Sequence, residues 1–201
     1  MTAFDPILPV VVIDDARDAE PLARALLAGG IRQAEITLRT GAALGALRTM
    51  SGVPGLRVGA GTVLEPQQAE AAIDAGATFV VSPGLADAVV AACERRGVQA
   101  VPGVATATEA MRARALGLRT VKFFPAESSG GPAAISAMAS VFPELAFVPT
   151  GGIDAARAAA YLALPAVVAV GGSWMVPRAA IAAGDFDAIE SLCRAAVEAA
   201  A

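Results

Sequence analysis

Short runs of valine, isoleucine and other apolar residues alternate along the chain with longer, alanine-rich runs. The short runs are typical of buried strands, and the longer runs repeat apolar residues at the spacing of an amphipathic helix. The strands are predicted at residues 7–13, 34–39, 56–61, 78–82, 98–102, 120–124, 146–149 and 166–171. The helices are predicted at residues 16–28, 42–50, 66–75, 86–96, 108–116, 131–141, 154–161 and 186–199.

This strict alternation indicates a parallel sheet covered by helices. Eight strand–helix units favour a closed (β/α)8 barrel of the TIM type, although 201 residues is short for that fold. An open, doubly wound sheet is the alternative. Because no linker rich in proline, glycine or serine interrupts the pattern, residues 1–201 are predicted to form a single domain.

The second predicted strand has one polar face. Side chains alternate along a strand, so Glu35, Thr37 and Arg39 share one face, and Ile36 and Leu38 share the other. In a barrel wrapped by helices, the apolar pair should face the helices. We therefore expect the polar trio to point into the barrel.

The sixth predicted strand carries Lys122. Thr120, Lys122 and Phe124 share one face of this strand, whereas Val121 and Phe123 share the other. The same reasoning turns Lys122 into the barrel, towards the acid and the arginine of the second strand. A purely structural core would not favour such a set of charged groups.

Lys122 is the sole lysine of the chain, and the other fourteen basic residues are arginines. It could be a surface lysine whose amine reaches solvent, or the remnant of a compositional bias toward arginine. Its apolar strand favours a third interpretation. Burial and a nearby Arg39 would both disfavour the ammonium, leaving a neutral amine that can attack a ketone and form a Schiff base. Arginine keeps its charge and could not take this role.

Two other charged residues of the polar face have both a chemical and a structural interpretation. Glu35 could be a general acid and base, or a partner in a buried ion pair with Arg39 or Lys122. Arg39, at the end of its strand, could bind a carboxylate or form a surface salt bridge.

Glycine pairs follow the seventh and eighth predicted strands, as Gly151–Gly152 and Gly171–Gly172. Barrels of this type often bind phosphate between these two loops, where backbone N–H groups approach the ligand closely. The pairs therefore predict a phosphate or phosphosugar site, although tight turns alone would also explain them. Thr62, after the third strand, could bind a substrate carboxylate or cap the next helix.

The composition narrows the function further. Hydrophobic residues make up 56% of the chain, charged residues 17%, and the net charge is −4, which argues against nucleic-acid binding. Without a histidine, the chain lacks the usual general base and the commonest metal ligand, so we expect neither a metal nor another cofactor.

Localisation is predicted from segments that are absent and from the cysteines. Residues 1–6 lack the basic start and apolar run of a signal peptide. Prolines and glycines interrupt the uncharged stretch between Arg157 and Arg178, so it does not read as a membrane span. Cys93 and Cys193 are distant in sequence and read as reduced thiols, which favours the cytoplasm.

Six short motifs resemble those of the 2-keto-3-deoxy-6-phosphogluconate (KDPG) aldolase family, also called 4-hydroxy-2-oxoglutarate aldolases. The similar motifs are EITLRT at 35–40, VGAGTVL at 58–64, SPG at 82–84, VKFFPAE at 121–127, PTGGI at 149–153 and GGSW at 171–174. Their order and spacing resemble the family's from about Ile7 to the C-terminus.

The resemblance implies a metal-independent class I aldolase that forms a homotrimer. It implies that Lys122 is the Schiff-base lysine and Glu35 the proton-transferring base. The other roles implied are carboxylate binding for Arg39 and Thr62, pocket lining for Pro83 and Phe124, a position near the substrate hydroxyl for Thr150, and phosphate binding for Gly151, Gly152, Gly172 and Ser173.

The expected reaction is cleavage of KDPG to pyruvate and glyceraldehyde 3-phosphate. Cleavage of 4-hydroxy-2-oxoglutarate to pyruvate and glyoxylate is the alternative, and a non-catalytic phosphosugar-binding barrel is another. The chain differs from the family's usual pattern in one respect, because only six residues precede the first predicted strand at Ile7. Members usually have a helix there that covers the barrel floor, so the closure of the floor is left open.

Overall fold

The computed structural model describes residues 4–200. Residues 1–3, which belong to the segment predicted to lack a signal peptide, and residue 201, the last of the predicted domain, lie outside the described residues. The strands are β1 (Ile7–Val11), β2 (Gln33–Thr37), β3 (Arg57–Gly61), β4 (Phe79–Val81), β5 (Gln99–Val101), β6 (Gly103–Val104), β7 (Thr120–Phe123), β8 (Ala146–Pro149) and β9 (Val170–Gly172). The α-helices are α1 (Ala19–Ala28), α2 (Ala43–Ser51), α3 (Pro66–Asp74), α4 (Asp87–Arg95), α5 (Ala107–Ala115), α6 (Gly131–Val141), α7 (Ala155–Leu162), α8 (Arg178–Ala183) and α9 (Phe186–Ala199). Two 3-10 turns, η1 (Ala16–Asp18) and η2 (Glu127–Ser129), precede α1 and α6.

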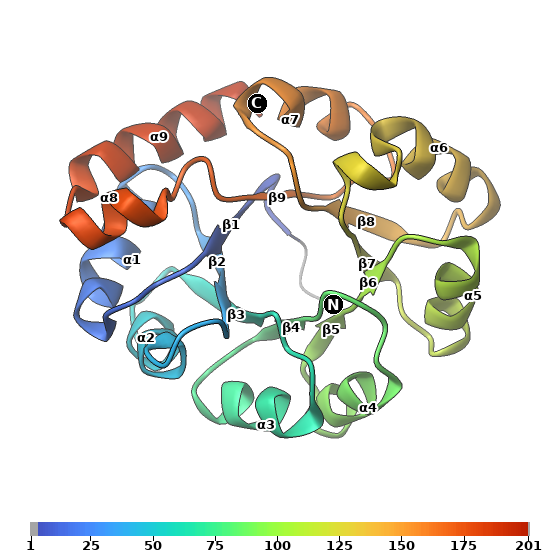
Figure 1. The fold of residues 1–201 in the computed structure, drawn as a ribbon, viewed down its shortest axis with the longest axis horizontal. Helices are drawn as coiled ribbons and strands as arrows, with labels where there is room; N and C mark the ends of the chain where they lie inside the picture. Colours follow the sequence, from blue (N-terminus) through green and yellow to red (C-terminus); the bar gives the residue numbers. More distant parts are fainter. Residues whose placement is uncertain (1–3, 201) are drawn as a thin grey trace.

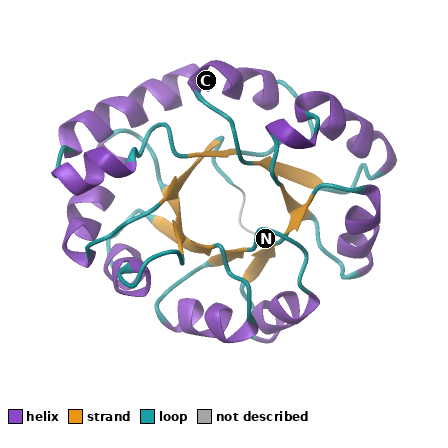
Figure 2. Ribbon diagram, viewed as in Figure 1, coloured by secondary structure: helices purple, strands orange, loops and turns teal. Residues whose placement is uncertain are grey.

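The strands pair in parallel and curl into a ring with the helices outside it (Figures 1 and 2). One sheet has the order β5-β4-β3-β2-β1-β9, and a second has the order β6-β7-β8. Two isolated parallel bridges, Phe147 with Val167 and Thr150 with Gly171, join the second sheet to the chain around β9. Strands from opposite ends of the sequence therefore become neighbours, and the carboxyl ends of all strands share one end of the ring.

Most predicted elements are present with ends shifted by a few residues, but the fifth strand is split and a short helix was missed. Pro102 separates β5 from β6 because it has no N–H for the ladder, although its carbonyl still accepts a bond from the Lys122 N–H at 2.9 Å. Of the last predicted strand, 166–171, only the end lies in a regular strand, β9. In its earlier part, the Ala166 carbonyl accepts from the Phe147 N–H, and the Val168 N–H donates to the Phe147 carbonyl. Helix α8 has no counterpart among the predicted helices.

The two faces of the strands bury different side chains. Ile36, Val121 and Phe123 pack with helix residues in two large apolar clusters outside the ring. The side chains between these positions face the interior, where a smaller cluster contains Leu8, Phe79, Val81, Val101, Val148 and Ala169. The alternation predicted for the second and sixth strands is therefore confirmed for Glu35 and Lys122.

The floor of the ring, at the amino ends of the strands, is closed by an aromatic and polar cluster. The Phe4 ring packs edge-on against Phe79, with ring centres 5.2 Å apart. The Arg57 guanidinium lies over both rings, at 4.5 Å from the centre of Phe4 and 5.1 Å from that of Phe79. Its Nη2 donates to Gln33 Oε1 at 2.6 Å. The question left open by the sequence is thus answered by Phe4 and Arg57.

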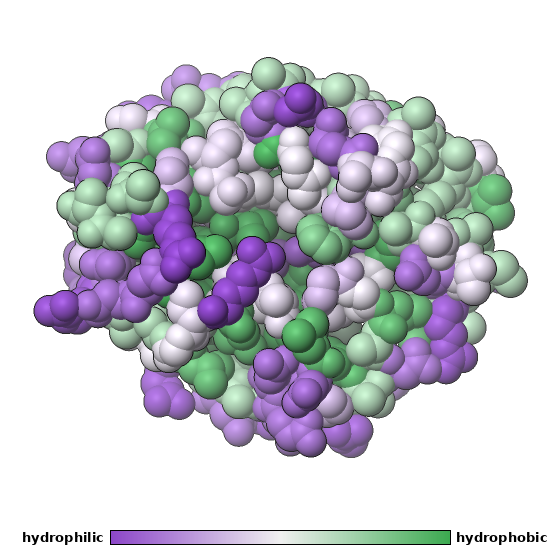
Figure 3. Space-filling view, viewed as in Figure 1, coloured by the Kyte–Doolittle hydropathy of each residue, from purple (hydrophilic) through white to green (hydrophobic). Residues whose placement is uncertain are grey.

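The surface seen along the ring axis is a mosaic of hydrophilic and apolar residues (Figure 3). Between residues 4 and 200, no helix has both the length and the apolar character needed to cross a bilayer. The uncharged stretch after Arg157 forms the rest of α7, the turn after it, β9 and the loop before α8.

Candidate active site

Lys122 and Glu35 meet inside the ring. The Lys122 Nζ lies 3.3 Å from Glu35 Oε1, and the two side chains are 8% and 1% exposed. Lys122 stands on β7 and Glu35 on β2, 87 residues apart in sequence. A basic amine and a carboxylate are therefore held in contact in a site that is largely closed to water.

The backbone on either side of Lys122 fixes its direction. In the parallel ladder its register partners are Gly103 on β6 and Val148 on β8. Its chain neighbours Val121 and Phe123 are fully buried on the helix side. Turning Lys122 outward would turn both neighbours inward, so packing keeps the amine in the ring.

Glu35 has an oxygen left to bind something else. Its Oε2 is buried and has no hydrogen-bond partner in the protein. Gly61 on β3 makes room for the carboxylate, because a Cβ at that position would lie 2.0 Å from Glu35 Oε1. The sequence analysis placed Gly61 at the end of the third predicted strand and missed this requirement for close approach.

Phe124 directly follows β7 and lies beside the Lys122 amine. Its ring centre lies 5.3 Å from Lys122 Nζ, and the side chain is half-buried. Pro83 follows β4 and is also half-buried. The Pro83 carbonyl oxygen lies so close to β6 that a Cβ at Gly103 would be 2.1 Å from it. Phe124 thus directly follows the strand of Lys122, and Pro83 lies against Gly103, the register partner of Lys122 on β6.

Arg39 is not in a strand, which corrects the prediction for this residue. Strand β2 ends at Thr37, and Arg39 stands in the following turn, where its N–H donates to the Thr37 carbonyl at 2.8 Å. Its exposed guanidinium donates from Nε to Thr62 Oγ1 at 3.2 Å. The strand alternation therefore does not apply to Arg39, whose guanidinium contacts Thr62 at the carboxyl end of the ring.

Thr62 has a backbone conformation that side chains rarely adopt. Its φ is +58°, in the left-handed region. It follows β3 directly and does not cap α3, whose N-cap is Glu65. Helix capping is therefore excluded for Thr62, and the strained backbone holds its hydroxyl beside Arg39.

Thr150 follows β8 and is buried. It lies two residues beyond Val148, the register partner of Lys122, and therefore on the same interior face. Gly171 on β9 makes room for it, because a Cβ there would lie 2.3 Å from Thr150 Oγ1. Its hydroxyl makes one long contact, 3.5 Å from the Val148 carbonyl oxygen.

The two glycine loops end neighbouring strands. Gly151 and Gly152 follow β8, with φ angles of +104° and +78°. Gly172 ends β9, and a Cβ there would lie 1.9 Å from the Trp174 ring. Ser173 is exposed beyond it. The Thr150–Gly171 bridge places these loops side by side at the carboxyl end of the ring.

The sequence did not predict a polar network that lies next to the loop of Gly151 and Gly152. Tyr161 on α7 donates its hydroxyl to Glu127, and burial together with this carboxylate raises the pKa of Tyr161. Glu127 also pairs with Arg157, Oε2 to Nε at 3.3 Å. The sequence signal was weak, because a glutamate in a turn and an arginine on a helix usually read as solvated surface.

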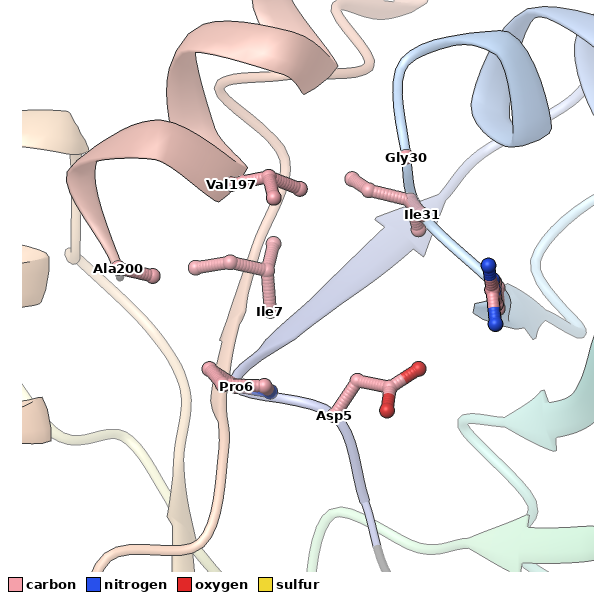
Figure 4. Close-up of a pocket in the computed structure, with 8 residues that line it drawn as sticks. Asp5, Pro6, Ile7, Gly30, Ile31, Val197 and Ala200 are labelled. Atoms are coloured by element: carbon pink, nitrogen blue, oxygen red, sulfur yellow. The ribbon is translucent and has the colours of Figure 1, made fainter.

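A separate pocket lies at the opposite end of the ring, beside the amino end of β1 (Figure 4). Ile7, Ile31 and Val197 point towards its interior, and Asp5 lies at its edge. None of the predicted site residues lines it. Among residues 4–200, no three histidine, cysteine, aspartate or glutamate side chains gather as metal ligands would.

A family model and two curated relatives point to the same family. The family model described as "KDPG and KHG aldolase" matches residues 2–192. The KHG/KDPG aldolase of Escherichia coli strain K12 is 46% identical over 194 residues, which are 96% of this chain and 91% of the relative. The 2-dehydro-3-deoxy-phosphogluconate aldolase of Pseudomonas aeruginosa is 49% identical over 193 residues, 96% of this chain and 88% of the relative.

Solved structures agree with these sequence relatives. KDPG aldolase from Legionella pneumophila, with pyruvate captured at low pH as a covalent carbinolamine intermediate, superposes with a TM-score of 0.92 at 43% identity. That match covers 96% of this chain and 94% of the other. The enzyme from Zymomonas mobilis ZM4 with 3-phosphoglycerate gives a TM-score of 0.89 at 46% identity, over 96% and 90% of the two chains. With its lysine–glutamate pair inside a ring of parallel strands, this chain belongs to the KDPG and KHG aldolase family.

Proposed function

We propose that this protein is a class I aldolase that cleaves KDPG to pyruvate and glyceraldehyde 3-phosphate. The observation that carries the proposal is the buried contact between the sole lysine, Lys122, and Glu35 at 3.3 Å. A desolvated amine is a good nucleophile toward a ketone, and a carboxylate within reach can move protons for it. The relatives named as aldolases support this reaction.

The first half of the reaction forms an imine on Lys122. The neutral amine attacks C2 of the keto acid to give a carbinolamine, and loss of water gives the protonated imine. Glu35 carries the proton that the amine loses to the alkoxide oxygen, through its unpartnered Oε2, directly or through one water molecule. One further proton, taken up from solvent, lets the hydroxyl leave as water, and Glu35 is again unprotonated for the next step. A carbinolamine with pyruvate was captured in the Legionella pneumophila relative, which supports this step.

The second half breaks the bond between C3 and C4. Glu35 removes the proton of the C4 hydroxyl, the bonding electrons move into the protonated imine, and the aldehyde leaves. Glu35 then returns a proton to C3 of the enamine, and water hydrolyses the imine to release pyruvate. Because the imine is the electron sink, we propose that the reaction is independent of metal and needs no cofactor.

The remaining site residues are proposed to hold the substrate. Arg39 and Thr62, joined at 3.2 Å, would bind the keto-acid carboxylate. Thr150 would contact the C4 hydroxyl, and Pro83 and Phe124 would line the pocket around the pyruvyl carbons. The backbone of Gly151, Gly152 and Gly172 and the Ser173 hydroxyl would bind the terminal phosphate.

Borohydride trapping tests the mechanism. Reduction in the presence of pyruvate should add one three-carbon unit, and peptide mass spectrometry should place it on Lys122. Because the chain has no other lysine, Lys122→Met should remove the modification, apart from any at the N-terminal amine. An unmodified wild-type protein that still releases pyruvate would refute the imine mechanism.

Cleavage of 4-hydroxy-2-oxoglutarate is a second activity of the same site. The name of the Escherichia coli relative, KHG/KDPG aldolase, favours it. Comparing kcat/KM for the two substrates, in the wild type and in Ser173→Ala, would rank them. Ser173→Ala should weaken turnover of the phosphorylated acid more strongly. A phosphosugar-binding barrel without catalysis would instead bind phosphate normally after Lys122→Ala and show no turnover in the wild type.

The architecture and assembly are proposed along with the function. The ring of parallel strands and the family relatives support a single (β/α)8 barrel domain over residues 1–201. We propose that three copies form a homotrimer, which sedimentation equilibrium would test. The free, buried thiols of Cys93 and Cys193 fit a cytoplasmic protein, and that location stays a prediction.

A further inference from the structure

Arg157 contacts the first glycine loop from behind. This residue of α7 donates from Nη1 to the Gly152 carbonyl at 3.4 Å. The same loop is held from the other side by the backbone of η2, where the Glu127 N–H donates to the Gly151 carbonyl at 3.1 Å. The loop is therefore fixed between two elements, and one of the groups that fix it is a cation.

Two carboxylates surround this cation. Arg157 Nη1 lies 2.7 Å from Asp154 Oδ2, and its Nε lies 3.3 Å from Glu127 Oε2. Glu127 also packs against the loop itself, because a Cβ on Gly152 would lie 2.9 Å from its Cβ and Cγ. Two negative charges and one positive charge thus lie beside the loop, at the place proposed for phosphate binding.

A phosphate at this loop would meet an electrostatic problem. Its charge is about −1.5 to −2 at neutral pH, and two uncompensated carboxylates beside the binding loop would repel it. Glu127 and Asp154 also have structural tasks, since Glu127 accepts from Tyr161 and Asp154 caps α7 by accepting from the Arg157 N–H at 3.0 Å. Both carboxylates are thus retained, and a cation must compensate for them.

We propose that Arg157 is a positioning and charge-compensating residue that selects phosphorylated substrates. It holds the Gly152 carbonyl and offsets the charges of Glu127 and Asp154, so that the backbone N–H groups of the loop can accept a phosphate dianion. It touches no reacting atom. This inference rests on the proposed function, because it takes the two glycine loops as the phosphate site.

The test compares KDPG with the same keto acid lacking the phosphate. For Arg157→Ala, KM for KDPG should rise about tenfold at low salt, whereas KM for the dephosphorylated acid should change less than about twofold. kcat for both should stay near the wild-type value, since Lys122 and Glu35 are untouched. Added salt should reduce the difference by screening the carboxylates.

Arg194→Ala is the matched control. Arg194 on α9 pairs with Glu190, and their side chains are 57% and 35% exposed, close to the 54% and 35% of Arg157 and Glu127. The Arg194→Ala variant removes the same charge from a similarly exposed ion pair on another helix. This variant should change neither KM.

A triple variant separates charge from shape. Adding Glu127→Gln and Asp154→Asn to Arg157→Ala removes all three charges and keeps acceptors for Tyr161 and for the α7 cap. The KM for KDPG should recover at least half of the loss. Equal losses for both substrates, no loss in Arg157→Ala, or no recovery in a folded triple variant would overturn the proposal.

The outcome is distinguishable from a failure of the proposed function. If the wild type traps pyruvate on Lys122 and cleaves KDPG, the function holds whatever Arg157 does. Thermal unfolding of each variant shows whether it is folded. Should Arg157→Ala unfold, Arg157→Gln replaces it, with the same expected difference between the two substrates.

Discussion

The two ends of the ring both bury charged groups, but they treat them differently. At the floor, the Arg57 guanidinium donates to Gln33 Oε1 at 2.6 Å and lies against two aromatic rings. Gln33 in turn donates to the carbonyls of Asp5 at 2.8 Å and Ile7 at 3.0 Å. Burial lowers the pKa of Arg57, yet the side chain stays charged because the ordinary pKa of arginine is far above neutral pH.

At the carboxyl end, the buried ionisable groups are left with unused hydrogen-bonding capacity. Lys122 and Glu35 share one contact of 3.3 Å, and Glu35 Oε2 has no protein partner. A buried carboxylate oxygen without a partner is costly, so a structure usually keeps one where a ligand or water will bind it. The comparison teaches that satisfied polar groups close the floor, while available ones mark the place for chemistry.

The largest effect should come from Glu35→Gln. Gln keeps the size and one acceptor for Lys122, but it cannot take up a proton, so kcat for KDPG cleavage should fall about 10²- to 10⁴-fold. Borohydride trapping of pyruvate on Lys122 should persist, although more slowly. Stopped-flow assays and mass spectrometry measure the two effects. Full turnover in this variant would show that the available oxygen has no catalytic task.

Gly61→Ala should give the next largest effect. The added methyl group would lie 2.0 Å from Glu35 Oε1 and 2.5 Å from its Cγ, so the carboxylate must move from Lys122. Because misplacement by about 1 Å can cost about 100-fold, kcat should fall by that order. Gly41→Ala is the control, since a Cβ there meets nothing within 4 Å. Equal kcat in both variants would contradict a fixed position for Glu35.

The same contrast explains how much of the site the sequence could predict. The inward direction of Glu35 and Lys122 followed from their neighbours Ile36 and Val121, because period-two alternation is a local property. The distance between them, the space at Gly61 and the positive φ of Thr62 depend on neighbouring strands and loops, and no run of residues specifies them. Arg39 was misplaced for this reason, since the strand ends two residues earlier at Thr37.

The floor and the Arg157 network show a second limit. Phe4, Gln33 and Arg57 are far apart in sequence, and each is unremarkable in its own segment. Their contacts arise when the ring brings the amino ends of strands together. The split at Pro102 was readable in principle, since proline lacks the N–H that a central strand needs.

Arg57→Met should show the opposite signature to Glu35→Gln. It removes the donor to Gln33 and the cation over Phe4 and Phe79, so the free energy of unfolding should fall by about 1–3 kcal/mol. The catalytic end keeps its contacts, and kcat/KM at 25 °C should stay within about twofold of wild type. Urea unfolding and the pyruvate-release assay measure the two quantities. A large loss of kcat/KM in a stable variant would show that the two ends are coupled.

Gln99→Leu should have the smallest effect, and it tests a floor residue that departs from the rule. Gln99 begins β5 opposite Phe79, and both of its amide atoms are buried without a partner in the protein. If these atoms are unsatisfied, leucine of similar size should raise the free energy of unfolding by up to about 1 kcal/mol, with kcat/KM unchanged. If instead the variant is destabilised by a similar amount, ordered water satisfies Gln99, and the floor obeys the same rule as Gln33. A loss of turnover would place this amide among the groups that serve the chemistry, which would break the division between the two ends.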